Sequence, residues 1–136
     1  MGKWYLCGPM SGIPQFNIPE FNKVAWALRE QEFDIVSPAE LDEPEFQQDC
    51  LASVDGKLPP GGKTWGDFLS RDVKLVADTV DGIILLPGWL DSRGARLEAF
   101  VGLLTDKEFA AYDPLTHRAL LRSTEWVRTM LRYNMP

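Results

Sequence analysis

The sequence predicts a three-layer α/β sandwich with a mostly parallel sheet. Short apolar runs that are typical of buried strands, such as residues 82–86, alternate with segments whose apolar residues recur at helical spacing, such as Phe21, Val24 and Leu28. The length of 136 residues fits one domain with one core, and the 45% hydrophobic and 25% charged content is ordinary for a globular protein. We therefore expect residues 1–136 to form a single domain whose crossovers are right-handed.

The individual elements follow from local signals. Glycines end the first apolar run in a tight turn, Asn17 is placed to cap the first helix, and Thr64 with Asp67 resembles a capping box for the next long one. The turn at residues 113–114 joins two short runs that resemble a hairpin. The expected strands are 3–7, 33–37, 82–86, 108–112 and 118–122, and the expected helices begin near 17, 64, 95 and 124.

Residues 40–63 depart from this pattern. The segment is acidic at one end and rich in proline and glycine at the other, which is typical of a surface insertion. A short helix is expected near residues 46–51.

Composition excludes several classes of function. The net charge of −6 argues against a nucleic-acid polymer as partner, and no apolar run is long enough to cross a membrane. The N-terminus lacks the features of a signal peptide, so we expect a cytoplasmic protein. The single histidine, His117, has no Cys or His at ligand spacing, so no metal site is implied. A small anionic ligand remains as the expected partner.

The expected binding edge lies where the first and third strands end. The turn at residues 8–12 and the loop at 87–92 both emerge at the carboxyl ends of parallel strands, where ligands of such sheets bind. Ser92, Gly94 and Glu98 stand at the start of the following helix, where free N–H groups and the helix dipole favour an anion. Glu98 is close enough to attack a sugar that carries that anion.

Three motifs in this frame resemble the DUF4406 family, which is common in phages and prophages. The motifs are residues 5–12, residues 65–72, and residues 85–89 with 92–98. That family resembles the nucleoside 2-deoxyribosyltransferase superfamily, which includes 2′-deoxynucleoside 5′-monophosphate N-glycosidases. The resemblance implies a flavodoxin-like (Rossmann-like) fold, a homodimer or higher homo-oligomer, and cleavage of the bond between base and sugar without a cofactor. It also places the protein in a bacterial or phage-infected cell.

The resemblance also implies catalytic roles for three residues. Glu98 aligns with the nucleophile, Asp72 with the acid that helps to protonate the leaving base, and Tyr5 with the tyrosine that orients the nucleophile. A carboxylate suits the first role because the transition state is oxocarbenium-like. Without the resemblance, Glu98 is a residue that favours the helix dipole, and Asp72 is a solvated partner of Arg71 or Lys74.

Substrate contacts are implied near the helix start. Ser92 stands where relatives that act on nucleoside monophosphates bind the 5′-phosphate, beside Gly94; it also suits a simple N-cap. Asp91 takes the place of the aspartate of the transferases if the loop shifts by one residue. Trp89 either stacks on a base, covers the pocket or packs at an interface.

The glycine-bearing turn supplies the expected pocket floor. Its members are Gly8, Met10, Ser11 and Gly12, with Ser11 as a second phosphate contact. Near the C-terminus, Trp126, Val127 and Met130 are candidates for a dimer interface.

The sequence thus favours an N-glycosidase acting on a (deoxy)nucleoside 5′-monophosphate. One alternative is a nucleoside 2-deoxyribosyltransferase that exchanges bases. Another is a non-catalytic protein that binds or senses a nucleotide.

Overall fold

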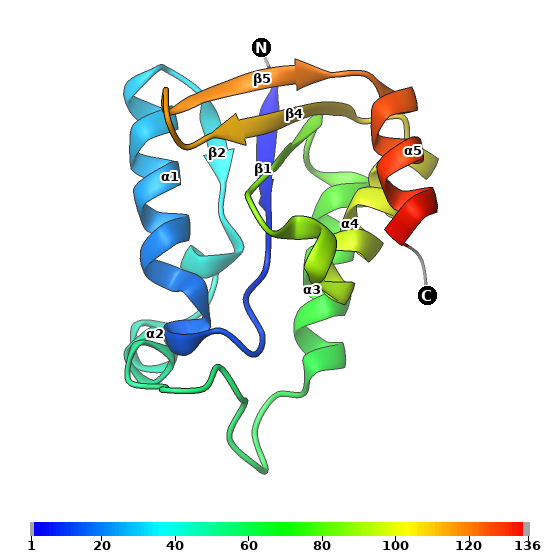
Figure 1. Ribbon diagram of the computed structural model, residues 1–136. Coiled ribbons are helices and arrows are strands. Elements are labelled where there is room, and N and C mark those ends of the chain that lie inside the picture. Colours follow the sequence, from blue (N-terminus) through cyan, green and yellow to red (C-terminus); the bar gives the residue numbers. More distant parts are fainter. Residues whose placement is uncertain (1, 135–136) are drawn as a thin grey trace.

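The computed structural model describes residues 2–134 and confirms the α/β sandwich (Figure 1). Five strands form one sheet in the order β2-β1-β3-β4-β5; the first four are parallel, and β5 pairs antiparallel with β4. The strands are β1 (Lys3–Cys7), β2 (Asp34–Val36), β3 (Gly82–Leu85), β4 (Glu108–Asp113) and β5 (Arg118–Arg122).

Helices cover both faces of this sheet, with α1 on one face and α3, α4 and α5 on the other (Figure 1). Neighbouring residues of β1 point to opposite faces: Leu6 packs with the α1 layer, and Tyr5 and Cys7 pack with the other layer. The helices are α1 (Ile18–Glu30), α2 (Pro44–Leu51), α3 (Trp65–Asp78), α4 (Arg93–Leu104) and α5 (Thr124–Asn134), with short 3-10 turns η1 (Pro14–Asn17), η2 (Pro38–Glu40) and η3 (Trp89–Asp91). None of the helices in residues 2–134 has the length and apolar character needed to span a bilayer.

One predicted cap is present and one is wrong. Thr64 and Asp67 form the expected capping box, with each side chain accepting from the other residue's backbone N–H at 3.2 and 2.8 Å. Asn17 instead has a left-handed backbone, with φ at 60°, and makes no cap hydrogen bond. Its Nδ2 donates to the Pro9 carbonyl at 2.9 Å, so the side chain stabilises the turn after β1 rather than the start of α1.

The residues proposed for a dimer interface pack inside the chain. Val127 is fully buried in the core beneath α5, which contradicts its prediction as an interface residue. Trp126 and Met130 pack against the same core, and the Trp126 ring lies 6.4 Å from that of Trp89.

The chain changes direction across the sheet at β1. From β1 it crosses to β2 over one face by way of α1, and from β2 it crosses to β3 over the other face by way of α3. The ends of β1 and β3 are therefore adjacent, with Cys7 opposite Leu85, and a crevice opens beyond them.

The insertion at residues 40–63 lies against this same edge of the sheet (Figure 1). Its backbone carbonyls at Ser53 and Gly56 accept hydrogen bonds from Gln15 and Gly12, at 2.8 and 2.9 Å. The segment is thus attached to the turn that follows β1.

Candidate active site

A pocket of about 250 Å³ opens at the carboxyl ends of β1 and β3. Its walls come from the turn after β1, from α3, from the start of α4 and from the insertion. The pocket therefore lies at the edge where the sequence placed the binding site.

The three predicted catalytic residues meet in this pocket. The Tyr5 hydroxyl donates to Glu98 Oε2 at 3.1 Å, although 93 positions separate the two residues in the chain. Tyr5 is fully buried, Glu98 is 6% exposed, and Asp72 is 8% exposed on α3. Burial on this scale contradicts the simpler reading of Glu98 as a surface residue that favours the helix dipole.

Small residues on α4 bring Glu98 to Tyr5. The buried face of the helix carries Ala95, Glu98, Ala99 and Gly102, which recur at helical spacing. A Cβ at Gly102 would lie 2.4 Å from the Ile83 Cδ1, so glycine allows this close approach to β3 without displacing the buried Ile83 side chain. The carboxyl of Glu98 then reaches the sheet.

Burial governs the protonation of the carboxyl pair. Desolvation, followed by the charge of Asp72, raises the pKa of Glu98 to about 8, although the hydrogen bond from Tyr5 opposes the rise. Burial also raises the pKa of Asp72, but the adjacent Arg71 guanidinium opposes this shift. Near neutral pH the proton of the pair therefore resides on Glu98, whereas Asp72 stands in an ion pair with Arg71.

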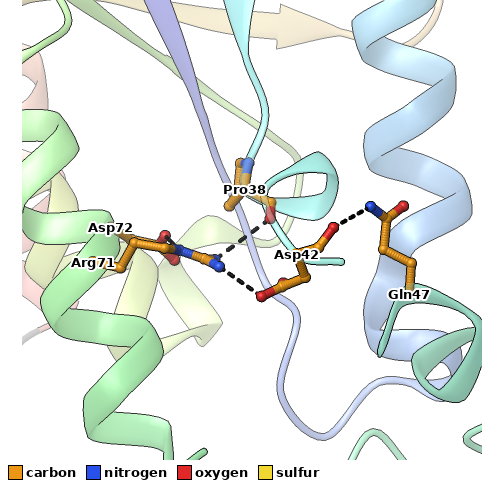
Figure 2. A network of polar contacts seen from close by, with 5 residues as sticks. All are labelled: Pro38, Asp42, Gln47, Arg71 and Asp72. Atoms are coloured by element: carbon orange, nitrogen blue, oxygen red, sulfur yellow. Dashed lines mark hydrogen bonds and ion pairs between the residues drawn. The ribbon is translucent and has the colours of Figure 1, made fainter. Parts of the chain in front are cut away.

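Arg71 lines the pocket beside Asp72, although the sequence did not indicate it as a site residue. Its Nε lies 2.9 Å from Asp72 Oδ1, its Nη1 lies 2.8 Å from Asp42 Oδ1, and its Nη2 lies 3.5 Å from the Pro38 carbonyl (Figure 2). Gln47 donates to the backbone carbonyl of Asp42 at 2.7 Å. Asp72 is thus paired with Arg71, as its alternative reading expected, but it is buried rather than solvated.

The start of α4 forms the other end of the pocket. Ser92 Oγ accepts from the Ala95 N–H at 3.2 Å, which confirms its reading as an N-cap. The cap uses the oxygen as an acceptor, so the hydroxyl hydrogen remains a donor that a ligand can use. The remaining predicted contacts that line the pocket are Gly8, Met10, Ser11, Asp91 and Gly94.

Two predicted contacts lie elsewhere. Trp89 is 6% exposed and packs in the core beneath α5 next to Trp126, so its prediction as a base-stacking residue or lid is wrong. Pro87 and Gly88 indicate a loop, but they do not indicate that the Trp89 ring points into the core. Gly12 lines a shallow neighbouring groove with Gly56.

The insertion forms a wall of the pocket rather than only a surface excursion. Phe46, Cys50 and Leu58 line the pocket from this segment. The Phe46 ring stacks on Phe68 of α3, with centroids 5.4 Å apart and planes at 24°. This apolar, aromatic wall suits a flat ring such as a nucleobase.

Within residues 2–134, no group of three or more His, Cys, Asp or Glu side chains is arranged to hold a metal ion. The polar side chains that line the pocket include carboxyl groups, hydroxyls, arginines and the thiol of Cys50.

Comparison with known proteins gives one match, to the family described as "Domain of unknown function (DUF4406)", over residues 2–108. The chain belongs to this family. No curated protein and no solved structure matches the chain. The DUF4406 region contains Tyr5, Asp72 and Glu98 together with the insertion, whereas β5 and α5 follow it.

Replacing Glu98 by glutamine tests the burial of its charge. Because the folded pKa is raised from 4.5 to about 8, the folded state binds more protons than the unfolded state between these values, and stability falls as the pH rises through this window. We expect Glu98→Gln to unfold like the wild type near pH 5 and to be more stable by roughly 2–4 kcal/mol near pH 9. Urea denaturation at both pH values measures this difference.

Glu30→Gln is the matched control, because Glu30 is exposed on α1. Its difference from the wild type should not change with pH. Equal stabilities of Glu98→Gln and the wild type near pH 9 would contradict the assigned burial of a titrating carboxyl.

Proposed function

We propose that this DUF4406 protein is an N-glycosidase that hydrolyses the bond between base and sugar of a (deoxy)nucleoside 5′-monophosphate. On this proposal the protein is a relative of the nucleoside 2-deoxyribosyltransferase superfamily. The observation that carries the proposal is the buried Glu98, held by the Tyr5 hydroxyl at 3.1 Å and facing the pocket beside the second buried carboxyl, Asp72.

The carboxyl pair supports a two-step reaction. Ionised Glu98 attacks the anomeric carbon, a bond from its oxygen to that carbon forms, and the bond to the base nitrogen breaks. The electron pair of the broken bond stays on the base, which takes the proton of Asp72. Water then attacks the same carbon and releases Glu98, while Asp72 accepts the proton of the water.

The charges that develop in the transition state favour the transfer of the shared proton from Glu98 to Asp72. In the free protein that proton resides on Glu98, whereas the first step requires it on Asp72. Positive charge growing on the sugar favours an ionised Glu98, and negative charge growing on the base favours a protonated Asp72. Tyr5 faces both carboxyls, since each raises the pKa of its hydroxyl.

The two ends of the pocket fit the remaining parts of a nucleotide. The capped start of α4, with Ser92 and Gly94, suits a phosphate because the first-turn N–H groups and the helix dipole favour an anion. The wall of Phe46 and Phe68 suits the base. The carboxyl pair lies in the same pocket and suits the sugar, which joins the phosphate to the base.

The proposal is tested by incubating the protein with a panel of mononucleotides and measuring free base by chromatography. We expect base release by the wild type and a loss of about 10³-fold or more in Glu98→Ala, because the nucleophile is absent. Glu30→Ala, at an exposed position of α1, should retain full activity.

Three outcomes would contradict the proposal. Full activity in Glu98→Ala would remove the assigned mechanism. Turnover of unphosphorylated nucleosides that requires a second base would show base exchange. Thermal stabilisation by a nucleotide without any product would show a binding protein.

Gly94→Ala tests the phosphate end of the pocket. A Cβ at Gly94 would lie 3.8 Å from Leu69 Cδ1 and 3.9 Å from Ser92 Oγ, which are ordinary contacts, so the fold tolerates it. Alanine favours a helix over glycine by up to about 1 kcal/mol, so stability should hold or rise. The added methyl group stands beside Ser92 in the pocket, and we expect the KM for monophosphates to rise about tenfold or more.

Steady-state kinetics and thermal melting of the same preparation separate the two effects. An unchanged KM for monophosphates would show that the phosphate does not bind at this helix start.

A further inference from the structure

Arg71 connects the carboxyl pair to the insertion. Its guanidinium lies between Asp72 on its own helix, at 2.9 Å, and Asp42 of the insertion, at 2.8 Å (Figure 2). The guanidinium is partly buried and lines the pocket. A cation shared between two carboxylates from separate segments controls the charge on both.

We propose that Arg71 is a positioning residue that determines which carboxyl of the buried pair keeps the shared proton. By pairing with Asp72 it holds that side chain ionised, so that the proton stays on Glu98 in the free protein. The importance of this arrangement for catalysis rests on the proposed function, but the arrangement itself does not.

The charges around the pair support this role. Arg71 forms an ion pair with Asp72 at 2.9 Å, and among the described residues no ion pair to Glu98 is found. It lowers the pKa of Asp72, whereas Asp42 raises it. The other titratable groups that face the pair or the adjoining pocket are Tyr5 and Cys7 from β1, Cys50 from the insertion, and Asp91 and Arg93 near the start of α4.

Asp42 and Asp72 compete for the same guanidinium. Nε faces Asp72 and Nη1 faces Asp42, so the positive charge is divided between them. Removing Arg71 and removing Asp42 must therefore shift the titration of Asp72 in opposite directions. This opposition separates an electrostatic role from a loss of structure, which has no reason to produce opposite signs.

The third contact of the Arg71 guanidinium, from Nη2, is weak enough for a substrate oxygen to replace it. Nη2 makes a long contact of 3.5 Å with the Pro38 carbonyl. A substrate oxygen that accepts from Nη2 draws the cation away from Asp72. Asp72 then becomes the more basic carboxyl and takes the proton that the leaving base needs.

The test is a titration of the side-chain carboxyls by carbon-13 NMR, on the full chain without substrate, with resonances assigned through Glu98→Gln and Asp72→Asn. In the wild type we expect Asp72 to titrate at lower pH than Glu98. In Arg71→Gln we expect the midpoint of Asp72 to move up, to or past that of Glu98. In Asp42→Asn we expect the same midpoint to move down.

Glu40→Gln is the matched control. It breaks the pair of Arg29 with Glu40, whose atoms lie 2.6 Å apart. Glu40 stands two residues before Asp42 in the chain and outside the pocket lining. The Asp72 midpoint should not move in this variant. If Arg71→Gln does not fold, Asp42→Asn decides alone: a downward shift supports the proposal and an unchanged midpoint overturns it.

Two results in the folded proteins would overturn the inference: an Asp72 midpoint that stays in place in Arg71→Gln, or a wild type in which Glu98 titrates first. Because the titration uses no substrate, its result is independent of whether any nucleotide is cleaved. Where base release is measured, the upper pH limb of kcat/KM should move to higher pH in Arg71→Gln. If the Asp72 midpoint moves in Arg71→Gln but the upper limb of the kcat/KM profile does not, the result would count against the proposed function. The inference about Arg71 would still hold.

Discussion

The arrangement of the pocket depends on the close packing of α4 on the sheet. Gly102 and two alanines let the helix approach β3, and this approach brings the Glu98 carboxyl within 3.1 Å of the Tyr5 hydroxyl, where both side chains are buried. Burial then raises the pKa of Glu98 to about 8 and couples it to Asp72. A larger residue at position 102 would have to displace the buried Ile83 side chain or shift α4, and the position of Glu98 depends on α4.

The protein carries these buried carboxyls at a cost to its stability. When a buried carboxyl loses its proton, the free energy of unfolding falls, because the charge is poorly solvated in the core. A neutral side chain of the same shape does not have this penalty. Groups held in such an unfavourable state are frequent where a protein needs a proton near neutral pH. The ion pair of Arg71 with Asp42 connects this site to the insertion, which also supplies Phe46 to the aromatic wall.

Much of the fold could be predicted from the sequence because its signals are local. The apolar run of β3 and the capping box at Thr64 each depend on a few adjacent residues. The meeting of Tyr5, Asp72 and Glu98 followed from strand ends on one edge together with the family resemblance. The pairing of Arg71 with Asp42 could not be predicted, because it depends on where an insertion with weak periodicity folds back, 29 positions away. The predictions for Asn17 and Trp89 are wrong because contacts with other parts of the fold determine where these side chains point.

Trapping the glycosyl-enzyme tests the central claim most directly. A mononucleotide with fluorine at the sugar 2-position slows release of the sugar, and the modified peptide is identified by mass spectrometry. The account predicts a sugar phosphate attached to Glu98, and no label in Glu98→Gln. A label on Asp72 or on any other residue would contradict it.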